Sequence, residues 1–428
     1  MNTDRIRSDF PALRHVRGRP SPVYLDSACM SLVPRPVLRA MEEYYSDFPG
    51  CAGRSLHRFA EEVTARYAAA REGFSRHFNA GGSEHVVFLR NATEALNLVG
   101  QGLPWRRGDR VLVSDQEHNS NLVLWQRLVQ ERGIRIEILP LTDDGTFDMD
   151  ALEAALRRSV RLVSLFHVSN LDGRSLPVQE IAERAHARKA QLLLDGCQAA
   201  PHERVDLEKI GADYYAISAH KMLGPTGTGA LLGRADSLEH LRPLLLGGET
   251  VEWSTLREHE LRPPPYRFEA GLQNYAGVIG AHAGLQYLDR VGLTEVRTHL
   301  IELNRRISEA LQDEPRIRQI GPAAPEDRPS IFAFDVLGID PHDVALFLDT
   351  GYSVMVRSGM HCVHSWYQRH HLPGNVRASL YFYNNPQDVE TFVRALRELV
   401  ERVPSPTVPA PTVPAVRVRA RKRRRVPS

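Results

Sequence analysis

Residues 190–198 read A-Q-L-L-L-D-G-C-Q, and residues 212–221 read A-D-Y-Y-A-I-S-A-H-K. Both are short apolar runs that end in polar residues, with Asp195 closing the first and Lys221 following the second. Continuous apolar runs of this length are typical of strands that are buried on both faces of a parallel sheet. Because ligands bind at the carboxyl ends of such strands, we expect Asp195 and Lys221 to face a binding site.

The sequence on the amino-terminal side of these runs continues the same alternation. Apolar runs predict further strands at 110–115, 134–141 and 161–168. Apolar residues three and four apart predict helices at 121–132, 149–158 and 178–189. Strands that alternate with helices indicate an α/β fold in which helices cover a mostly parallel sheet.

The pattern changes after about residue 290. A long amphipathic helix is expected at 296–312 and a last helix at 387–403, with short strands and a further helix between them. This mixture predicts a smaller α+β domain at the C-terminal end. We expect an N-terminal segment at 1–25 that packs on the small domain, a large domain at 26–290, the small domain at 291–403 and a disordered tail at 404–428.

The tail is rich in proline and ends in seven basic residues with no acidic one: Arg417, Arg419, Arg421, Lys422, Arg423, Arg424 and Arg425. Such a segment cannot build a packed core. Contact with nucleic acid or anionic lipid is one interpretation, and a solvated tail without a dedicated partner is the favoured one.

The start of the chain lacks the apolar run of a signal peptide, and no stretch reaches the roughly eighteen apolar residues of a membrane helix. We therefore expect no membrane contact and a cytoplasmic location. The four cysteines, Cys29, Cys51, Cys197 and Cys362, are too sparse for a disulfide scaffold and are expected to be thiols.

The pairing of Asp195 with Lys221 points to one cofactor chemistry. A buried acid at a strand end is costly unless it meets a cation, and the pyridinium nitrogen of pyridoxal 5'-phosphate is such a cation. A lysine that forms a Schiff base is the standard covalent anchor of this cofactor. Together the two residues indicate pyridoxal phosphate more strongly than either does alone.

Other residues fit the same site. His118 follows a strand end and can stack on a flat ring, and Gln198 can donate to the phenolic oxygen of the cofactor. Residues suited to the phosphate are Ala92 and Thr93 at the start of a helix, with Ser218 and His220 beside the lysine. Each residue alone has an ordinary structural interpretation as a helix cap or a satisfied polar residue. Their joint occurrence has no such ordinary interpretation.

A set of motifs in order carries a family resemblance: Y-L-D-S-A from Tyr24, E-H-N-S-N, H-V-S-N-L-D-G, D-G-C-Q-A, S-A-H-K with G-P-T-G, R-F-E-A-G, R-S-G-M-H-C and R-A-S-L-Y-F-Y-N. The chain resembles the class V aminotransferase family of fold type I pyridoxal phosphate enzymes, and within it the SUF-type cysteine desulfurases. The resemblance covers nearly the whole chain except the tail.

The resemblance implies conversion of L-cysteine to L-alanine, with a persulfide on Cys362 for the synthesis of iron–sulfur clusters or other sulfur-containing products. It also implies a homodimer and a sulfur-acceptor protein. The implied cofactor residues are Lys221 as the Schiff-base lysine, Asp195 at the pyridinium, His118 stacked on the ring, Thr93, Ser218 and His220 at the phosphate, and Asn170 and Gln198 near the ring oxygen. Arg377 is the implied anchor for the substrate carboxylate, with Arg357 a second candidate and Asn170 near the substrate.

Two other roles are considered for Cys362 besides the nucleophile, namely a buried inert cysteine and a zinc ligand. Its glycine and polar neighbours argue against a core strand, and His361 and His364 lack two well-spaced partner ligands, so no metal is expected. His361, His364 or Arg357 can favour the thiolate that a nucleophile requires. Cys29 and Cys51 lack a glycine-flanked loop, and Cys197 lies beside the acid, so none of the three is expected to hold sulfur stably.

Four positions depart from the SUF-type pattern. Met360, Gly53 and Asn119 stand where histidines are usual. Tyr275 stands where a threonine usually reaches the phosphate of the neighbouring subunit, and a phenol can make that bond too. These departures keep open a selenocysteine lyase, a C–S or C–N lyase, or an amino-acid epimerase. A scaffold that binds nucleic acid through the tail is disfavoured by the intact lysine, acid and arginine set.

Overall fold

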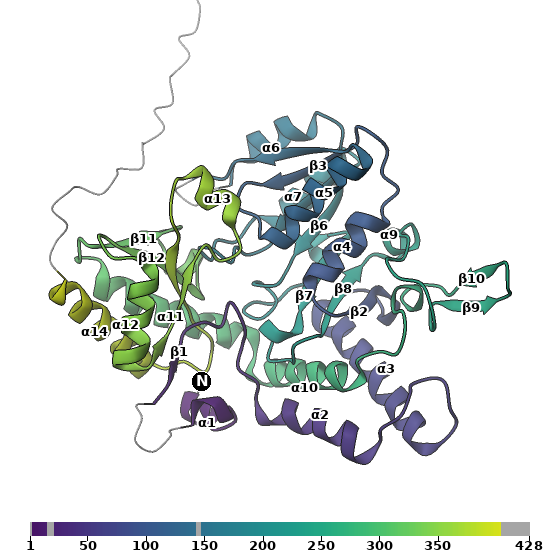
Figure 1. Cartoon of the computed structure of the whole chain (residues 1–428), viewed down its shortest axis with the longest axis horizontal. Helices are drawn as coiled ribbons and strands as arrows, with labels where there is room; N and C mark the ends of the chain where they lie inside the picture. Colours follow the sequence, from purple (N-terminus) through teal and green to yellow (C-terminus); the bar gives the residue numbers. More distant parts are fainter. Residues whose placement is uncertain (1, 15–20, 143–146, 404–428) are drawn as a thin grey trace, which may run out of the picture.

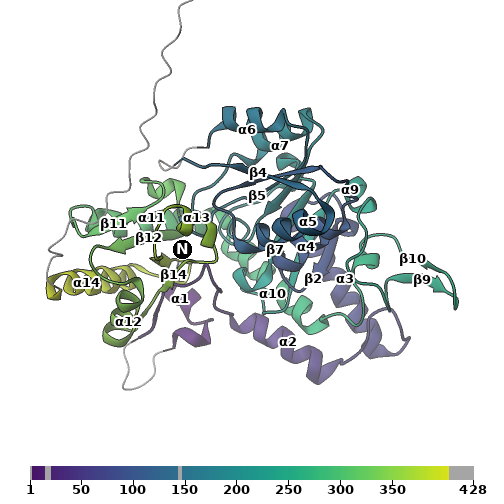
Figure 2. The same cartoon turned by 45° about the horizontal axis from the view of Figure 1, so that its top comes forward.

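The structure is a computed structural model that describes residues 2–14, 21–142 and 147–403. The predicted basic tail lies outside the described residues. Two sheets lie side by side, a seven-stranded one and a four-stranded one, each with its own helices (Figures 1 and 2). The prediction of an α/β fold with a larger, mostly parallel sheet and a smaller α+β part is confirmed.

The larger sheet has the strand order β2-β8-β7-β6-β5-β3-β4. Its strands are β2 (Val86–Leu89), β3 (Arg110–Ser114), β4 (Arg135–Leu139), β5 (Val160–Phe166), β6 (Gln191–Asp195), β7 (Tyr214–Ser218) and β8 (Gly229–Gly233). The strands from β7 to β4 are parallel, and β8 pairs antiparallel with both β7 and β2. The carboxyl ends of β3, β5, β6 and β7 therefore lie at one edge.

Both faces of this sheet are buried, which explains its continuous apolar runs. In β6, Leu192 and Leu194 join the apolar cluster on one face, and Leu193 joins the cluster on the other. Helices α4 (Ala92–Gly102) and α5 (Val123–Arg132) cover the face of Leu193. The opposite face is covered by α3 (Arg58–Phe78), α6 (Met149–Leu156), α7 (Val178–Ala187) and α10 (Tyr275–Val291). The sheet is thus held rigidly between two helical layers.

The smaller sheet has the order β11-β12-β15-β14 and is antiparallel throughout. Its strands are β11 (Ile317–Ile320), β12 (Ile331–Val336), β14 (Arg357–Gly359) and β15 (Asn375–Ser379), and its helices are α11 (Leu293–Leu311), α12 (Pro341–Tyr352), α13 (His364–Arg369) and α14 (Pro386–Arg402). Helix α14 begins with a capping box between Asn385 and Asp388.

The N-terminal segment runs beside the smaller sheet before it reaches the larger one. Helix α1 (Thr3–Arg7) is tied to it because Arg7 donates to the Asp388 carboxylate at 2.8 Å. Strand β1 (Val23–Tyr24) pairs in parallel with β13 (Val354–Met355), and Asp26 forms a bridge with Ser379. This pairing leads the chain between the two sheets at Ala28 and Cys29.

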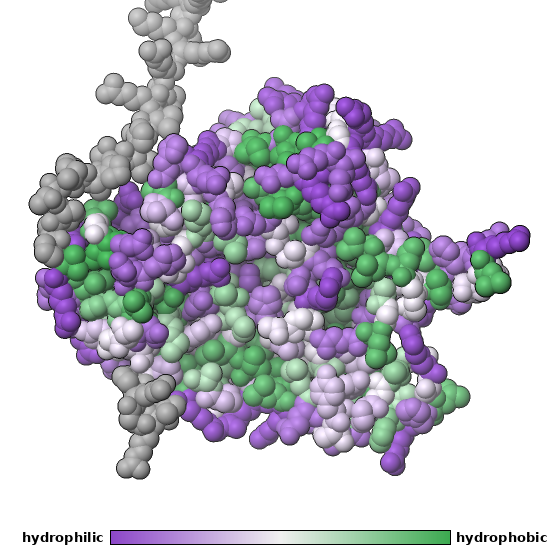
Figure 3. Space-filling model, in the orientation of Figure 1, coloured by the Kyte–Doolittle hydropathy of each residue, from purple (hydrophilic) through white to green (hydrophobic). Residues whose placement is uncertain are grey.

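The remaining helices are α2 (Arg35–Asp47), α8 (Leu207–Ile210) and α9 (Ala235–Glu239), and strands β9 (Val251–Ser254) and β10 (His259–Leu261) form a hairpin that projects from the body (Figure 1). Hydrophobic surface gathers on and beside this hairpin (Figure 3), where Trp253 and Leu256 are exposed. Within the described residues, no helix is both long enough and apolar enough to cross a membrane.

Candidate active site

A cavity of about 240 Å³ lies between the two sheets. It brings together eleven of the residues expected at the site: Ala92, Thr93, His118, Asn170, Asp195, Ser218, His220, Lys221, Arg357, Cys362 and Arg377. We call the side formed by His118, Asp195, Ser218 and Lys221 the sheet wall, and the side formed by Arg357, His361 and Cys362 the loop wall.

The sheet wall places an acid beside an amine because two neighbouring strands end there. Asp195 is the last residue of β6, and its carboxylate accepts a hydrogen bond from the backbone N–H of Cys197 at 3.1 Å. Lys221 closes the short 3₁₀ turn after β7. Gly196 lets the chain turn closely, since a Cβ there would lie 2.0 Å from the ring of Tyr215.

One end of the cavity is suited to an anion. Helix α4 begins here, and its first backbone N–H, from Ala92, donates to Ser218 Oγ at 2.9 Å. The hydroxyls of Thr93 and Ser120 are hydrogen-bonded to each other at 2.7 Å. A helix N-terminus with adjacent hydroxyls is a ready site for a phosphate. Ser120 was not predicted, although it lies in the quoted E-H-N-S-N motif.

His118 and His220 are uncharged members of this cavity at neutral pH. Burial, with a further effect of Lys221, lowers the pKa of His118 to about 4, and Asp195 opposes that shift. Burial and Lys221 likewise lower the pKa of His220 to about 4. His118 Nδ1 accepts from the backbone N–H of Ser120 at 3.1 Å, which fixes the ring. A neutral, oriented imidazole is suited to stacking on an aromatic cofactor.

The loop wall depends on contacts with the opposite side of the cavity. His361 and Cys362 both have positive φ, 46° and 61°, which is unfavourable for residues with side chains. Their carbonyl oxygens accept hydrogen bonds of 2.7 Å, His361 from Asn170 Nδ2 and Cys362 from the backbone N–H of Asn119. The Asn119 side chain is also hydrogen-bonded to His364 Nδ1 at 2.8 Å. These hydrogen bonds hold the loop that carries Cys362 against the larger sheet, and we call the one between Asn119 and His364 the latch.

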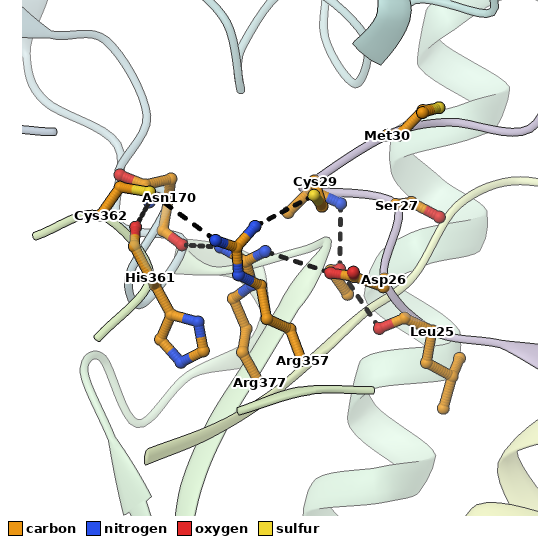
Figure 4. A network of polar contacts seen from close by, with 12 residues as sticks. Leu25, Asp26, Ser27, Cys29, Met30, Asn170, Arg357, His361, Cys362 and Arg377 are labelled. Atoms are coloured by element: carbon orange, nitrogen blue, oxygen red, sulfur yellow. Dashed lines mark hydrogen bonds and ion pairs between the residues drawn. The ribbon is translucent and has the colours of Figure 1, made fainter. Parts of the chain in front are cut away.

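Two arginines, Arg357 of the loop wall and Arg377, lie side by side between Cys362 and Cys29 (Figure 4). Arg357 Nη2 donates to Cys362 Sγ at 3.6 Å. Arg377 donates to the Asn170 carbonyl at 2.7 Å and lies 3.3 Å from an Asp26 carboxylate oxygen, while its buried Nε has no partner among the described residues. Burial lowers the pKa of Arg377, and Asp26 opposes this effect. Arg377 is thus a buried cation that Asn170 and Asp26 hold at the edge of the cavity.

Cys197 lines the same cavity but is held as a thiol. Burial raises its pKa to about 12, and the negative charge of Asp195 acts in the same direction. Its Sγ donates to Ser218 Oγ at 3.6 Å. Cys197 is therefore unsuited to nucleophilic attack at neutral pH.

Two predicted cofactor residues lie outside the lining of this cavity. Gln198 Nε2 donates to the Ala28 carbonyl at 2.8 Å, and its Oε1 is buried without a partner among the described residues. Tyr275 lies at a separate cavity of about 270 Å³, where its ring meets that of Tyr67 edge to face. Contact of Tyr275 with a second subunit stays a prediction. In the described ranges, no group of three His, Cys, Asp or Glu is arranged to hold a metal ion.

The cavity also contains residues that were not among the predicted site residues: Ala28, Cys29, Asn91, Ser120, Cys197 and His361. Asn91 caps helix α4 by accepting a hydrogen bond from the Glu94 backbone N–H at 3.0 Å. This helix-start pattern can be recognised in the local sequence. Ala28 ends the quoted Y-L-D-S-A motif, and it reaches the cavity with Cys29 through the long-range pairing of β1 with β13. No local pattern reveals that pairing.

The residues present fit pyridoxal phosphate. Asp195 can meet a pyridinium, Lys221 can bond the aldehyde carbon, His118 is a neutral flat ring, and the start of α4 can take the phosphate. The guanidinium of Arg377, which also lines the cavity, is suited to a substrate carboxylate.

Comparisons with known proteins identify the family of the chain. The family model for class V aminotransferases matches residues 23–392. A probable cysteine desulfurase of Streptomyces coelicolor is 37% identical over 407 residues, 93% of this chain and 97% of the relative. A cysteine desulfurase of Klebsiella pneumoniae is 36% identical over 405 residues, with 93% and 98% covered.

The fold is likewise that of a solved relative. An apo structure of a cysteine desulfurase from Thermococcus onnurineus superposes with a TM-score of 0.89 at 36% identity, covering 94% of this chain and 98% of that one. The family model spans most of the chain, and the relatives exceed 30% identity over nearly all of it. The chain belongs to the class V aminotransferase family.

Proposed function

We propose that this protein is a pyridoxal phosphate-dependent cysteine desulfurase, which converts L-cysteine to L-alanine and leaves the sulfur atom on Cys362. The observation that carries the proposal is that Cys362 opens into the same cavity as Lys221 and Asp195, with the Arg357 guanidinium at its sulfur. The net reaction joins L-cysteine and the Cys362 thiol to give L-alanine and a Cys362 persulfide, so that atoms and electrons balance.

When bound, pyridoxal phosphate supplies a ring that accepts the electrons of the bond broken at the substrate Cα. When the cofactor is bound, Lys221 would hold it covalently, and the Lys221 amine can carry a proton to and from the substrate Cα. Asp195 would meet the ring nitrogen with its carboxylate and keep it protonated. His118 would stack on the ring, and the start of α4 with Thr93, Ser218 and His220 would hold the phosphate. Gln198 lies next to the cavity residue Ala28.

Substrate orientation is assigned to Arg377 and Asn170. Arg377 lines the cavity, and its guanidinium can bind the substrate carboxylate. Asn170 couples this anchor to the loop wall, since its carbonyl accepts from Arg377 and its side chain donates to the His361 carbonyl. A substrate held this way directs its sulfur toward Cys362.

The sulfur step requires a thiolate, because a thiol is a poor nucleophile. The Cys362 thiolate attacks the substrate sulfur, the Cβ–S bond breaks, and the carbon fragment is protonated to become alanine. Arg357, which donates to Cys362 Sγ, compensates the negative charge before and after the attack. Cys362 then holds the sulfur for an acceptor.

We further infer a homodimer, a sulfur-acceptor protein and a cytoplasmic location. Exposed apolar side chains on and near the projecting hairpin, including Leu246, Trp253 and Leu256, support burial against a second copy. The persulfide requires an acceptor, which passes the sulfur to iron–sulfur clusters or other sulfur-containing products. All four cysteines are unpaired, which fits a reducing compartment.

The test is to add L-cysteine to the purified holoprotein, with and without a thiol reductant, and to measure alanine and sulfide. We expect alanine in a single burst without reductant, and sulfide with continuing alanine formation when reductant is present. Sulfide with pyruvate and no alanine indicates a C–S lyase instead. Turnover of L-selenocysteine alone indicates a selenocysteine lyase, and racemised cysteine an epimerase.

A further inference from the structure

Cys29 is a second thiol in the cavity, facing the same arginine as Cys362. Arg357 Nη1 donates to Cys29 Sγ at 3.0 Å and Nη2 donates to Cys362 Sγ at 3.6 Å. Figure 4 shows one sulfur on each side of the arginine head group. Both cysteines are half-buried and line the cavity.

We propose that Cys29 is a second sulfur carrier, which takes the sulfur from Cys362 and frees Cys362 for another turnover. This inference rests on the proposed function, because the sulfur must first reach Cys362. It also revises the expectation from the sequence, in which Cys29 had no part because the fold that brings it to Arg357 is not visible there.

The transfer is a thiol–disulfide exchange that needs no further reactant. The Cys29 thiolate attacks the outer sulfur of the Cys362 persulfide, a new S–S bond forms to Cys29, and the bond between that sulfur and Cys362 breaks. Cys362 leaves as a thiolate, and any proton on the outer sulfur stays there. One S–S bond replaces another, so nothing is oxidised or reduced overall.

The position of Arg357 suits both ends of this exchange. The reaction moves one negative charge from the sulfur of Cys29 to that of Cys362, and the same guanidinium donates to both atoms. The outer sulfur also lengthens the Cys362 side chain by about 2 Å, the length of an S–S bond.

The other two cysteines do not offer this arrangement. Burial raises the pKa of Cys197 to about 12, so its thiolate is scarce at neutral pH. Cys51 does not line the cavity and lies on the loop before α3. Cys29, in contrast, precedes Met30, which is 39% exposed, so a sulfur on Cys29 is close to the protein surface.

The first experiment locates the sulfur. The holoprotein is mixed with L-cysteine without reductant, quenched with an alkylating agent before unfolding, and mapped by peptide mass spectrometry. We expect the added sulfur on Cys362 first and on Cys29 after a lag, with none on Cys51. Cys51 is the internal control, because scrambling of sulfur after unfolding labels it as well.

The second experiment counts turnovers. Without reductant, wild type should release roughly two alanines per chain in the burst, because Cys362 is reloaded once after passing its sulfur on. Cys29→Ala should release about one, with its sulfur retained on Cys362, and the control Cys51→Ser should behave as wild type. Cys362→Ser should carry no sulfur on Cys29, since the relay begins at Cys362.

The outcomes separate the two claims. Sulfur on Cys362 alone, with equal bursts in wild type and Cys29→Ala, overturns the relay and leaves the desulfurase intact. Sulfur on Cys29 in Cys362→Ser also overturns it, because Cys29 then attacks the substrate directly. Sulfur on neither cysteine and no alanine refutes the proposed function itself.

Discussion

The two walls of the cavity are built by different means. The sheet wall consists of strand ends in a sheet that is buried on both faces. Close packing of that core holds Asp195 and Ser218 in place. The loop wall follows the short strand β14 and contains two successive residues with positive φ, His361 and Cys362. The difference suits the proposed function, in which the sheet wall binds the cofactor and the loop wall carries the sulfur.

Contacts across the cavity help to hold the shape of the loop wall, beside its own contacts with the smaller sheet such as His361 Nε2 with Asn375 Oδ1. A left-handed conformation costs about 1–2 kcal/mol for a residue with a side chain, and two such residues follow one another here. The hydrogen bonds from Asn170 and Asn119 to their carbonyls offset that cost. Breaking these contacts should therefore loosen Cys362 and leave the sheet wall unchanged.

Removing Lys221 tests the sheet wall and should have the largest effect. Lys221→Ala should lose covalently bound pyridoxal phosphate and reduce alanine formation by on the order of 10²–10⁴-fold, the usual range for a group that transfers a proton. The measurements are cofactor absorbance after gel filtration and alanine per chain. Lys221→Arg is the matched control, because it keeps the charge without an amine that can bond the cofactor. Full activity in either variant contradicts the assignment.

Removing the Cys362 thiol tests the loop wall and should separate cofactor binding from sulfur transfer. Cys362→Ser should bind pyridoxal phosphate as wild type does, because Lys221 and Asp195 are untouched. Sulfide and alanine formation should fall by about 10²-fold, because a hydroxyl cannot replace a thiolate in attack on sulfur. Cys51→Ser controls for loss of a thiol outside the cavity. Normal turnover of L-cysteine by Cys362→Ser would remove Cys362 from the mechanism.

The same contrast explains what the sequence could predict. Local patterns predict the positions of Asp195, Ser218 and Lys221, because an apolar run followed by a polar residue marks a strand end. The predicted strands and helices of the larger sheet are found within a few residues of their expected positions. The loop wall depends on contacts between residues far apart in the chain, such as Asn119 with His364 and Val23 with Val354. Only a folded structure brings Cys29 to Arg357.

Cys197 and Cys362, two of the three cysteines that line the cavity, should differ in their reaction with iodoacetamide. A pKa of about 12 leaves Cys197 with about one part in 10⁴ of thiolate at pH 8. Its modification should rise about tenfold for each pH unit between 7 and 9 and still remain minor. Cys362, half-buried beside Arg357, should be modified before Cys197 at pH 7, as measured by peptide mass spectrometry. Faster modification of Cys197 contradicts the assignment of Cys362 as the reactive thiol.

The latch between Asn119 and His364 should give the smallest effect and the most specific one. Asn119→Ala removes the side-chain hydrogen bond to His364 and keeps the backbone donor to the Cys362 carbonyl. A net hydrogen bond contributes about 0.5–1.5 kcal/mol, so kcat/KM for alanine formation should fall roughly 2- to 10-fold. Cofactor absorbance and affinity should not change, because the cofactor residues of the sheet wall are untouched.

A double-mutant cycle distinguishes this latch from two independent effects. If Asn119 and His364 act through one hydrogen bond, the double variant Asn119→Ala with His364→Ala should lose no more activity than the worse single variant. Gln368→Ala, exposed on the same helix α13, is the control and should behave as wild type. Losses that multiply show that the two side chains do not cooperate, and a loss of cofactor affinity shows that Asn119 acts on the sheet wall. The latch predicts neither, because its only role is to hold the cysteine loop against the larger sheet.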